Sequence, residues 1–284
     1  MGQKDFNLDH AFQRAMEAVL EAGRILKKGF RKTKIYQKKG AVDLVTEWDF
    51  KSQETVISRL QTHFPDADFL VEESGIERRV SPYCWVLDPL DGTTNFVHGF
   101  PFFCVSLALI CEDVPLLGIV HNPELEETYW ALNGKGAFFN SRPIQVSLLT
   151  KVSQSLLATG FPYNIRKTYK PILKRFEQVI IRAQGVRRAG SAAMDLCLVA
   201  RGVFSGCWEQ FLKPWDTAAG VLIVAEAGGR ISDFSGRPFH IEKKQILATN
   251  GLIHQEMLEI LADRDLPDKH GKVNIQGTEY KRFY

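Results

Sequence analysis

Two aspartates three residues apart, Asp88 and Asp91, follow an apolar run in the stretch WVLDPLDGTTNFVHGFPFF, residues 85–103. Burying carboxylates beside apolar residues is costly unless a positive charge compensates them. These two side chains, with the main-chain carbonyl of Leu90 between them, are the hard oxygen ligands that Mg²⁺ or Mn²⁺ prefers. The spacing therefore indicates a divalent metal site, with a simple Asp-Gly turn or a helix cap as the structural alternative.

The residues directly after the aspartates suit an anion. Gly92, Thr93 and Thr94 can begin a helix whose free N–H groups and hydroxyls point outward. A helix N-terminus of this kind attracts phosphate. A metal site next to a phosphate site is typical of phosphoryl chemistry, in which catalysis is mostly positioning and electrostatics.

Further carboxylates stand at the ends of predicted elements. Glu72 and Glu73 come directly after the apolar run 69–71. Asp216 begins an apolar helix in KPWDTAAG, and Asp49 lies on the first turns of another helix. A helix cap would explain Asp216, and a solvated helix carboxylate would explain Asp49. Together, however, they place several carboxylates at element ends, where functional groups gather in layered α/β folds.

The rest of the pattern predicts the elements that must hold these side chains. Apolar residues at helical spacing predict helices over residues 8–31, 46–64, 169–184, 191–200, 214–227 and 253–262. Short apolar runs and turn signals predict strands at 69–71, 83–87, 102–110, 116–121, 128–132, 137–139, 186, 203–208 and 246–248. A strand-rich first half and a helix–strand second half indicate layered, mixed α and β structure.

The composition bounds the class of protein. The chain has 284 residues, 45% of them hydrophobic, and a net charge of only +3. These values are typical of a globular protein and do not by themselves indicate nucleic-acid binding. No apolar run is long enough for a membrane span, and the N-terminus carries no apolar signal region. Five cysteines without a C-x-x-C pair favour reduced thiols. We therefore expect a cytoplasmic protein.

Several long segments resemble one known family. WVLDPLDGTTNFVHGFPFF is similar to the core signature of the inositol monophosphatase family, and KPWDTAAGVLIVAEAGG resembles its second signature. VDLVTEWD, LVEESG and RRAGSAAMDL also look like family segments, so the resemblance covers about residues 8–262. It implies a lithium-sensitive, Mg²⁺-dependent phosphomonoesterase with alternating αβαβα layers, assembled as a homodimer. We expect one catalytic domain over residues 1–265, with halves of about 1–145 and 146–265, and a polar tail over 266–284.

The resemblance also implies a set of metal ligands. Glu72 and Asp88, with the Leu90 carbonyl, would hold one Mg²⁺. Asp88, Asp91 and Asp216 would hold a second, and Glu72 would also face a third, weaker position. The expectation is thus two or three Mg²⁺ ions per site, with Mn²⁺ as an alternative ion.

Carried over in the same way, Gly92 and Thr93 would cradle the phosphate through their backbone N–H groups. Thr93 would pair with Asp49 to orient a metal-activated water, with Glu72 assisting, and Lys38 would lie near the metal loop.

On the other side of the substrate, Gly190, Ser191 and Ala192 would line the sugar. Glu209 would accept hydrogen bonds from substrate hydroxyls and repel a second phosphate.

The resemblance favours hydrolysis of myo-inositol monophosphate, a small phosphorylated polyol. Fructose 1,6-bisphosphate, histidinol phosphate and nucleotide phosphates are the alternative substrates. A different class of function is binding to RNA or a transcription complex through the basic stretch 27–40 and Arg182, Arg187 and Arg188. The alternative explanation of that stretch is a solvated helix end, where lysines are favourable.

Overall fold

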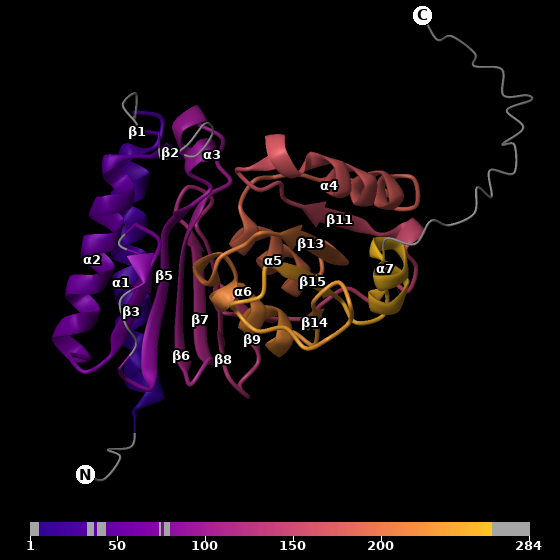
Figure 1. Ribbon diagram of the computed structural model, residues 1–284. Helices are drawn as coiled ribbons and strands as arrows, with labels where there is room; N and C mark the ends of the chain where they lie inside the picture. Colours follow the sequence, from indigo (N-terminus) through magenta and orange to yellow (C-terminus); the bar gives the residue numbers. More distant parts are fainter. Residues whose placement is uncertain (1–5, 33–36, 39–43, 74, 77–79, 263–284) are drawn as a thin grey trace, which may run out of the picture.

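The computed structural model describes residues 6–32, 37–38, 44–73, 75–76 and 80–262, which form five layers (Figure 1). Helices α1 (Leu8–Gly29) and α2 (Glu47–His63) cover the outer face of an eight-stranded sheet. Helices α5 (Ala192–Ala200) and α6 (Pro214–Glu226) lie between this sheet and a five-stranded sheet. Helices α4 (Ile165–Ile180) and α7 (His254–Leu261) pack on the far side of the second sheet. This is the alternating αβαβα arrangement that the family resemblance implied.

The larger sheet has the strand order β10-β9-β8-β7-β6-β5-β3-β4. Its strands are β3 (Asp68–Val71), β4 (Gly75–Ile76), β5 (Tyr83–Asp91), β6 (Cys104–Cys111), β7 (Val114–Asn122), β8 (Glu127–Leu132), β9 (Ala137–Phe139) and β10 (Arg142–Ile144). β3 and β5 are parallel neighbours, with Val71 beside Leu87. The residues that follow these two positions, Glu72 and Asp88, are therefore brought to the same edge of the sheet.

The smaller sheet has the order β12-β11-β13-β15-β14. Its strands are β11 (Leu156–Thr159), β12 (Gly185–Arg187), β13 (Gly206–Gln210), β14 (Arg230–Ser232) and β15 (Gln245–Thr249). β11 runs parallel to both of its neighbours, and Thr159 pairs with Trp208 on β13. The remaining elements are β1 (Gln37–Lys38) paired with β2 (Leu44–Val45), the short helix α3 (Thr93–His98) and a 3-10 turn (Val152–Gln154).

Three apolar cores fill the gaps between the layers: one under α1 and α2, one around α5 and α6 that contacts both sheets, and one under α4 and α7. Alanines on the buried face of α1, such as Ala11, Ala15 and Ala18, let that helix lie close to its neighbours. α6 is buried between the sheets over residues 217–224, which explains the apolar sequence of this part of the helix. The caps are local: Thr46 begins α2 by accepting from the Trp48 N–H, and Asp49 returns a bond from the Thr46 N–H.

Some predicted boundaries were wrong. β5 does not end at residue 87 but continues to Asp91, with an irregularity in its pairing to β6 between Asp88 and Asp91. Pro89 falls inside this irregular stretch, where a missing N–H is tolerated. α4 begins at Ile165 instead of residue 169. The strands β1, β2, β4, β10, β11 and β14 were not predicted, and each is only two to four residues long, too short to show a clear alternation.

The predicted tail, residues 266–284, lies outside the described residues. Within the part of the chain that is described, no helix has the length and apolar character needed to cross a membrane.

Candidate active site

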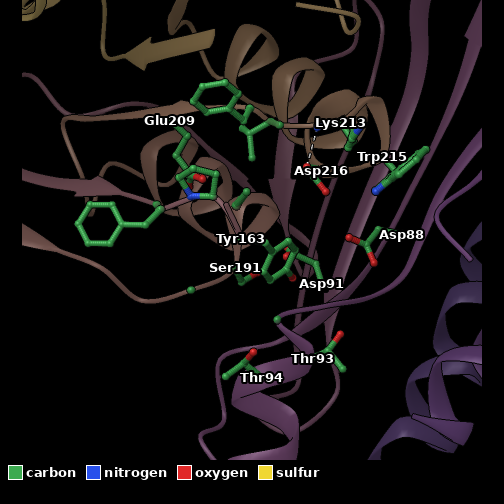
Figure 2. Close-up of a pocket in the computed structure, with 18 of the residues that line it drawn as sticks. Asp88, Asp91, Thr93, Thr94, Tyr163, Ser191, Glu209, Lys213, Trp215 and Asp216 are labelled. Carbon is green, nitrogen blue, oxygen red and sulfur yellow. Dashed lines mark hydrogen bonds between the residues drawn. The ribbon is translucent and has the colours of Figure 1, made fainter. Parts of the chain in front are cut away.

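A pocket of about 550 Å³ is lined by residues from both halves of the chain. Eleven of the thirteen residues predicted for the site line it: Glu72, Asp88, Leu90, Asp91, Gly92, Thr93, Gly190, Ser191, Ala192, Glu209 and Asp216. Asp49 does not line the pocket but contacts Thr93, which does. Lys38 lies on β1, and its side chain is outside the described part of the chain. The fold thus gathers segments more than a hundred residues apart around one space (Figure 2).

Three aspartates face the same part of this pocket (Figure 2), and each is anchored through one oxygen. Asp88 Oδ1 accepts from the Leu90 N–H at 3.0 Å. Asp91 Oδ2 accepts from the Ser191 hydroxyl at 2.7 Å and the Ala193 N–H at 2.8 Å. Asp216, in the first turn of α6, accepts from the Lys213 N–H at 2.7 Å. The capping role considered for Asp216 is therefore real, and the same side chain also lines the pocket.

The carboxylates oppose one another's ionisation. Burial, with the negative charges of Glu72, Asp91 and Asp216, raises the pKa of Asp88 well above its usual range. Burial and the charge of Asp91 do the same to the pKa of Asp216. Burial also raises the pKa of Asp91, against the hydrogen bonds from Ser191 and Ala193. A cluster of this kind is stable in its ionised form only with a compensating cation.

The donor set fits a hard divalent cation, because carboxylate and carbonyl oxygens from β3, β5 and α6 meet at one pocket. Among the described residues, however, no group of three or more acidic, histidine or cysteine side chains stands ready to hold a metal ion. The carboxylates line one pocket without lying at the mutual distances of a formed metal site.

Thr93 and Asp49 form a second feature, just behind the aspartates. The Thr93 hydroxyl lies 3.2 Å from Asp49 Oδ1 and 3.0 Å from the Leu90 carbonyl oxygen, both of which can accept its proton. Asp49 is almost fully buried, and burial raises its pKa to about 6 despite bonds from Thr46 and Thr93. A carboxyl group with a pKa near neutrality is suited to exchanging a proton.

The turn between β5 and α3 requires a glycine. Gly92 has φ +90°, and a Cβ at this position would lie 2.9 Å from the Phe102 carbonyl oxygen. The Asn95 side chain donates to Phe102 O at 2.7 Å and to Ala189 O at 2.9 Å, which ties α3 to the segment leading into α5. These contacts hold the turn against the second half of the chain, at the place predicted to cradle phosphate.

Glu209 forms the opposite wall of the pocket, on β13. Its carboxyl is buried, and burial together with the charge of Asp91 raises its pKa to about 8. A Cβ at Gly160 would lie 2.0 Å from Glu209 Oε2, so only glycine leaves room for this side chain. A carboxyl group near its pKa both donates and accepts hydrogen bonds, which suits the hydroxyls of a polyol.

Several pocket residues were not predicted from the sequence. Arg188 had been assigned to a basic surface, but it lines the pocket, where its positive charge opposes the rise that burial causes in the pKa values of Asp91 and Glu209. Tyr163 and Phe211 line the pocket with exposed rings, and Trp215 lies beside Asp216. The neighbouring KPWD motif could have indicated Trp215. Arg188 could have been indicated by its place in RRAGSAAMDL, two residues before Gly190. Nothing local in the sequence indicates Tyr163 or Phe211.

Comparisons with known proteins agree with this geometry. The model of the inositol monophosphatase family matches residues 7–265. The inositol-1-monophosphatase of Synechocystis sp. (strain ATCC 27184 / PCC 6803 / Kazusa) is 46% identical over 250 residues, covering 87% of each chain. The solved inositol monophosphatase from Anabaena (Nostoc) sp. PCC 7120 superposes with a TM-score of 0.83 at 40% identity, covering 90% of this chain and 96% of that one. A putative Nus factor SuhB of Neisseria meningitidis serogroup B (strain ATCC BAA-335 / MC58) is 41% identical over 224 residues, 78% of this chain and 85% of the relative.

Proposed function

The chain belongs to the inositol monophosphatase family, whose members are phosphoric monoester hydrolases, and we propose that it hydrolyses myo-inositol monophosphate to inositol and phosphate. The observation that carries the proposal is the composition of one pocket. An acidic cluster, a glycine turn leading into a helix and a buried glutamate line it together. These suit a divalent cation, a phosphate and a polyol respectively.

The family is metal-dependent, and we assign Mg²⁺ to the acidic cluster. Glu72, Asp88, Asp91, Asp216 and the Leu90 carbonyl would hold it. The Leu90 oxygen accepts one bond from Thr93 and has a second lone pair for an ion. When bound, Mg²⁺ neutralises the carboxylates, polarises the phosphoryl oxygens and makes water more acidic.

The chain's own residues then position the reactants. The Gly92 turn and the first turn of α3 receive the phosphate oxygens. Thr93 orients the attacking water, and Asp49 takes up a proton through the Thr93 hydroxyl, 3.2 Å away. Glu72, at the end of β3, assists from the same edge of the sheet. Glu209 holds the hydroxyls of the alcohol so that the ester oxygen faces the cluster.

Phosphate release by the purified protein tests this proposal directly. The panel contains inositol 1-phosphate, glycerol 2-phosphate, histidinol phosphate, fructose 1,6-bisphosphate and NADP, each with and without Mg²⁺ and Li⁺. We expect Mg²⁺-dependent, lithium-inhibited turnover with the inositol ester preferred. Preference for a bisphosphate would overturn inositol monophosphate as the substrate but would leave the proposal of Mg²⁺-dependent phosphate ester hydrolysis unchanged. A folded protein that releases phosphate from none of these esters would refute the function.

A second candidate is the one considered from the sequence, binding to RNA or a transcription complex through basic residues, and one relative is named a putative Nus factor. Arg187 and Arg188 are both exposed, and Arg188 also lines the pocket, so a basic surface at this place would adjoin the active site. If RNA binding is genuine, it should be retained in Asp91→Asn, weaken in Arg187→Ala and fall steeply with salt. Filter binding across a salt series measures all three.

We also propose a homodimer, as the family resemblance implies, and a reducing compartment, as the cysteine pattern of the sequence indicates. The five cysteines are all described and all free, which supports the second part of this proposal. Sedimentation equilibrium tests the first part.

A further inference from the structure

Phe211 has an unusual backbone conformation at the mouth of the pocket. It follows β13 directly, and its φ of +66° lies in the left-handed region. Six non-glycine residues in the described part of the chain have positive φ, and Phe211 is the one among them that is aromatic and lines the pocket. A bulky side chain in this region is a strained outlier that glycine would relieve.

The strain does not come from a need to bury the ring. The Phe211 side chain is 42% exposed, while its N–H is fixed by a bond to the Lys244 carbonyl oxygen at 2.5 Å. The backbone is thus held in place by its neighbours, and an apolar ring is left facing water. Strained residues that are retained under these conditions cluster at ligand-binding sites.

Other aromatic rings share the mouth of this pocket. Tyr163 is 54% exposed and lines the same cavity. Phe161, also a lining residue, is fixed from behind by an edge contact with Phe176, and the Arg188 guanidinium lies 5.7 Å from its ring centroid. Exposed apolar rings gathered in one pocket mark a binding surface. We call Phe161, Tyr163 and Phe211 the aromatic rim.

The pocket therefore offers two kinds of surface to one substrate. Carboxylates and the Gly92 turn suit the phosphate, and Glu209 suits hydroxyls, whereas the aromatic rim suits a flat ring. A cavity of about 550 Å³ is within the size range that accepts drug-sized ligands. Resting on the proposed function, we propose that Phe211 is a specificity-determining residue, whose exposed ring receives a planar ring on the alcohol part of the phosphate ester.

The test compares two secondary-alcohol esters that differ in this feature. Adenosine 2′-monophosphate carries a planar base, and glycerol 2-phosphate carries none. The readout is the ratio of their kcat/KM values, measured with Mg²⁺ for the wild-type protein, Phe211→Gly and Phe211→Tyr. One stacking contact between a base and an aromatic ring changes affinity by roughly tenfold or more.

We expect Phe211→Gly to lower the ratio about tenfold, mainly through KM for the nucleotide, and Phe211→Tyr to restore it. Phe211→Gly should also raise Tm, because the strained φ is relieved. The matched control is Glu112→Gly, which places glycine at another position of positive φ (+48°). This position lies in the β6–β7 turn, away from the pocket lining. It should leave the ratio unchanged.

If Phe211→Gly leaves the ratio of the two kcat/KM values unchanged, because it affects both esters equally or neither, this inference is overturned and the proposed function stands. If the wild-type protein hydrolyses neither of these esters nor inositol 1-phosphate, the proposed function fails and this inference fails with it.

Discussion

Replacing Gly160 by alanine would place a methyl group where the Glu209 carboxyl now lies. The new Cβ would be 2.0 Å from Oε2 and 2.3 Å from Cδ, far inside van der Waals contact. β11 and β13 are paired directly before this point, at Thr159 and Trp208, so the strands cannot simply separate. The Glu209 side chain must therefore rotate away from its position on the pocket wall.

The cost follows from the hydrogen bonds that Glu209 would lose. Two bonds from substrate hydroxyls to this carboxyl are worth about 1.5–3 kcal/mol in total. We therefore expect kcat/KM for inositol 1-phosphate to fall roughly 10- to 100-fold in Gly160→Ala. Steady-state phosphate release measures this, with thermal unfolding recorded in parallel.

A double variant separates the clash from general damage. If the methyl group acts by displacing Glu209, then adding Gly160→Ala to Glu209→Ala should cost little more, because the carboxyl is no longer there to be displaced. Gly185→Ala on β12 is the control, since its Cβ would lie 3.3 Å from the flexible tip of Leu156. A Gly160→Ala protein with kcat/KM within twofold of wild type would refute the placement of Glu209 against the substrate.

Three further predictions concern the metal cluster and two buried titratable groups. Asp91→Asn should keep the fold, because an amide oxygen can still accept hydrogen bonds from Ser191 and Ala193. The variant should lose Mg²⁺ affinity and roughly 10³-fold in turnover, which calorimetric Mg²⁺ titration and phosphate release measure. Near-normal activity would remove Asp91 from the set of metal ligands. Burial lowers the pKa of His254 to about 4, between Ser232 and Thr249. The unfolded chain therefore binds the proton first, and His254 itself should lower the free energy of unfolding by about 2 kcal/mol from pH 7 to pH 5, measured as the difference in pH dependence between the wild-type protein and His254→Gln. Denaturant melts in which the two proteins change equally with pH would contradict this. Asp195 is buried without a hydrogen-bond partner for either oxygen among the described residues, and burial raises its pKa. Asp195→Asn should therefore raise the free energy of unfolding at pH 7 by about 1–3 kcal/mol. This gain should shrink toward pH 4, because Asp195 of the wild-type protein is then protonated in the unfolded chain as well. A gain of equal size at pH 4 would show that the charge is not the cause.

The sequence revealed the site best where the relevant residues lie close together along the chain. Asp88, Leu90 and Asp91 sit in one short motif, so their types and spacing were enough to predict a shared pocket. The partnership of Gly160 and Glu209 depends instead on the parallel pairing of β11 and β13. Because β11 is a four-residue strand without alternation, no local pattern showed that these two positions would meet.

Phe211 and Arg188 were not predicted as pocket residues for a related reason. Whether an exposed side chain faces a pocket depends on the backbone conformation of a loop, here a left-handed residue after β13 and the segment between β12 and α5. Arg188 stands next to Arg187 in the chain, yet Arg188 lines the pocket and Arg187 does not. Neighbouring residues of one type can thus have different surroundings, and composition alone cannot separate them.

The proposed ligands come from both halves of the chain, and this affects when the protein can become active during synthesis. Glu72, Asp88 and Asp91 leave the ribosome early, but Asp216 lies on α6, three quarters of the way along. Glu209 sits on β13, which is completed only when β15 (Gln245–Thr249) emerges and pairs with it. A nascent chain would therefore carry an incomplete, mutually repelling set of carboxylates until nearly the whole protein is made. With the site residues as proposed, hydrolysis begins only when translation is almost finished.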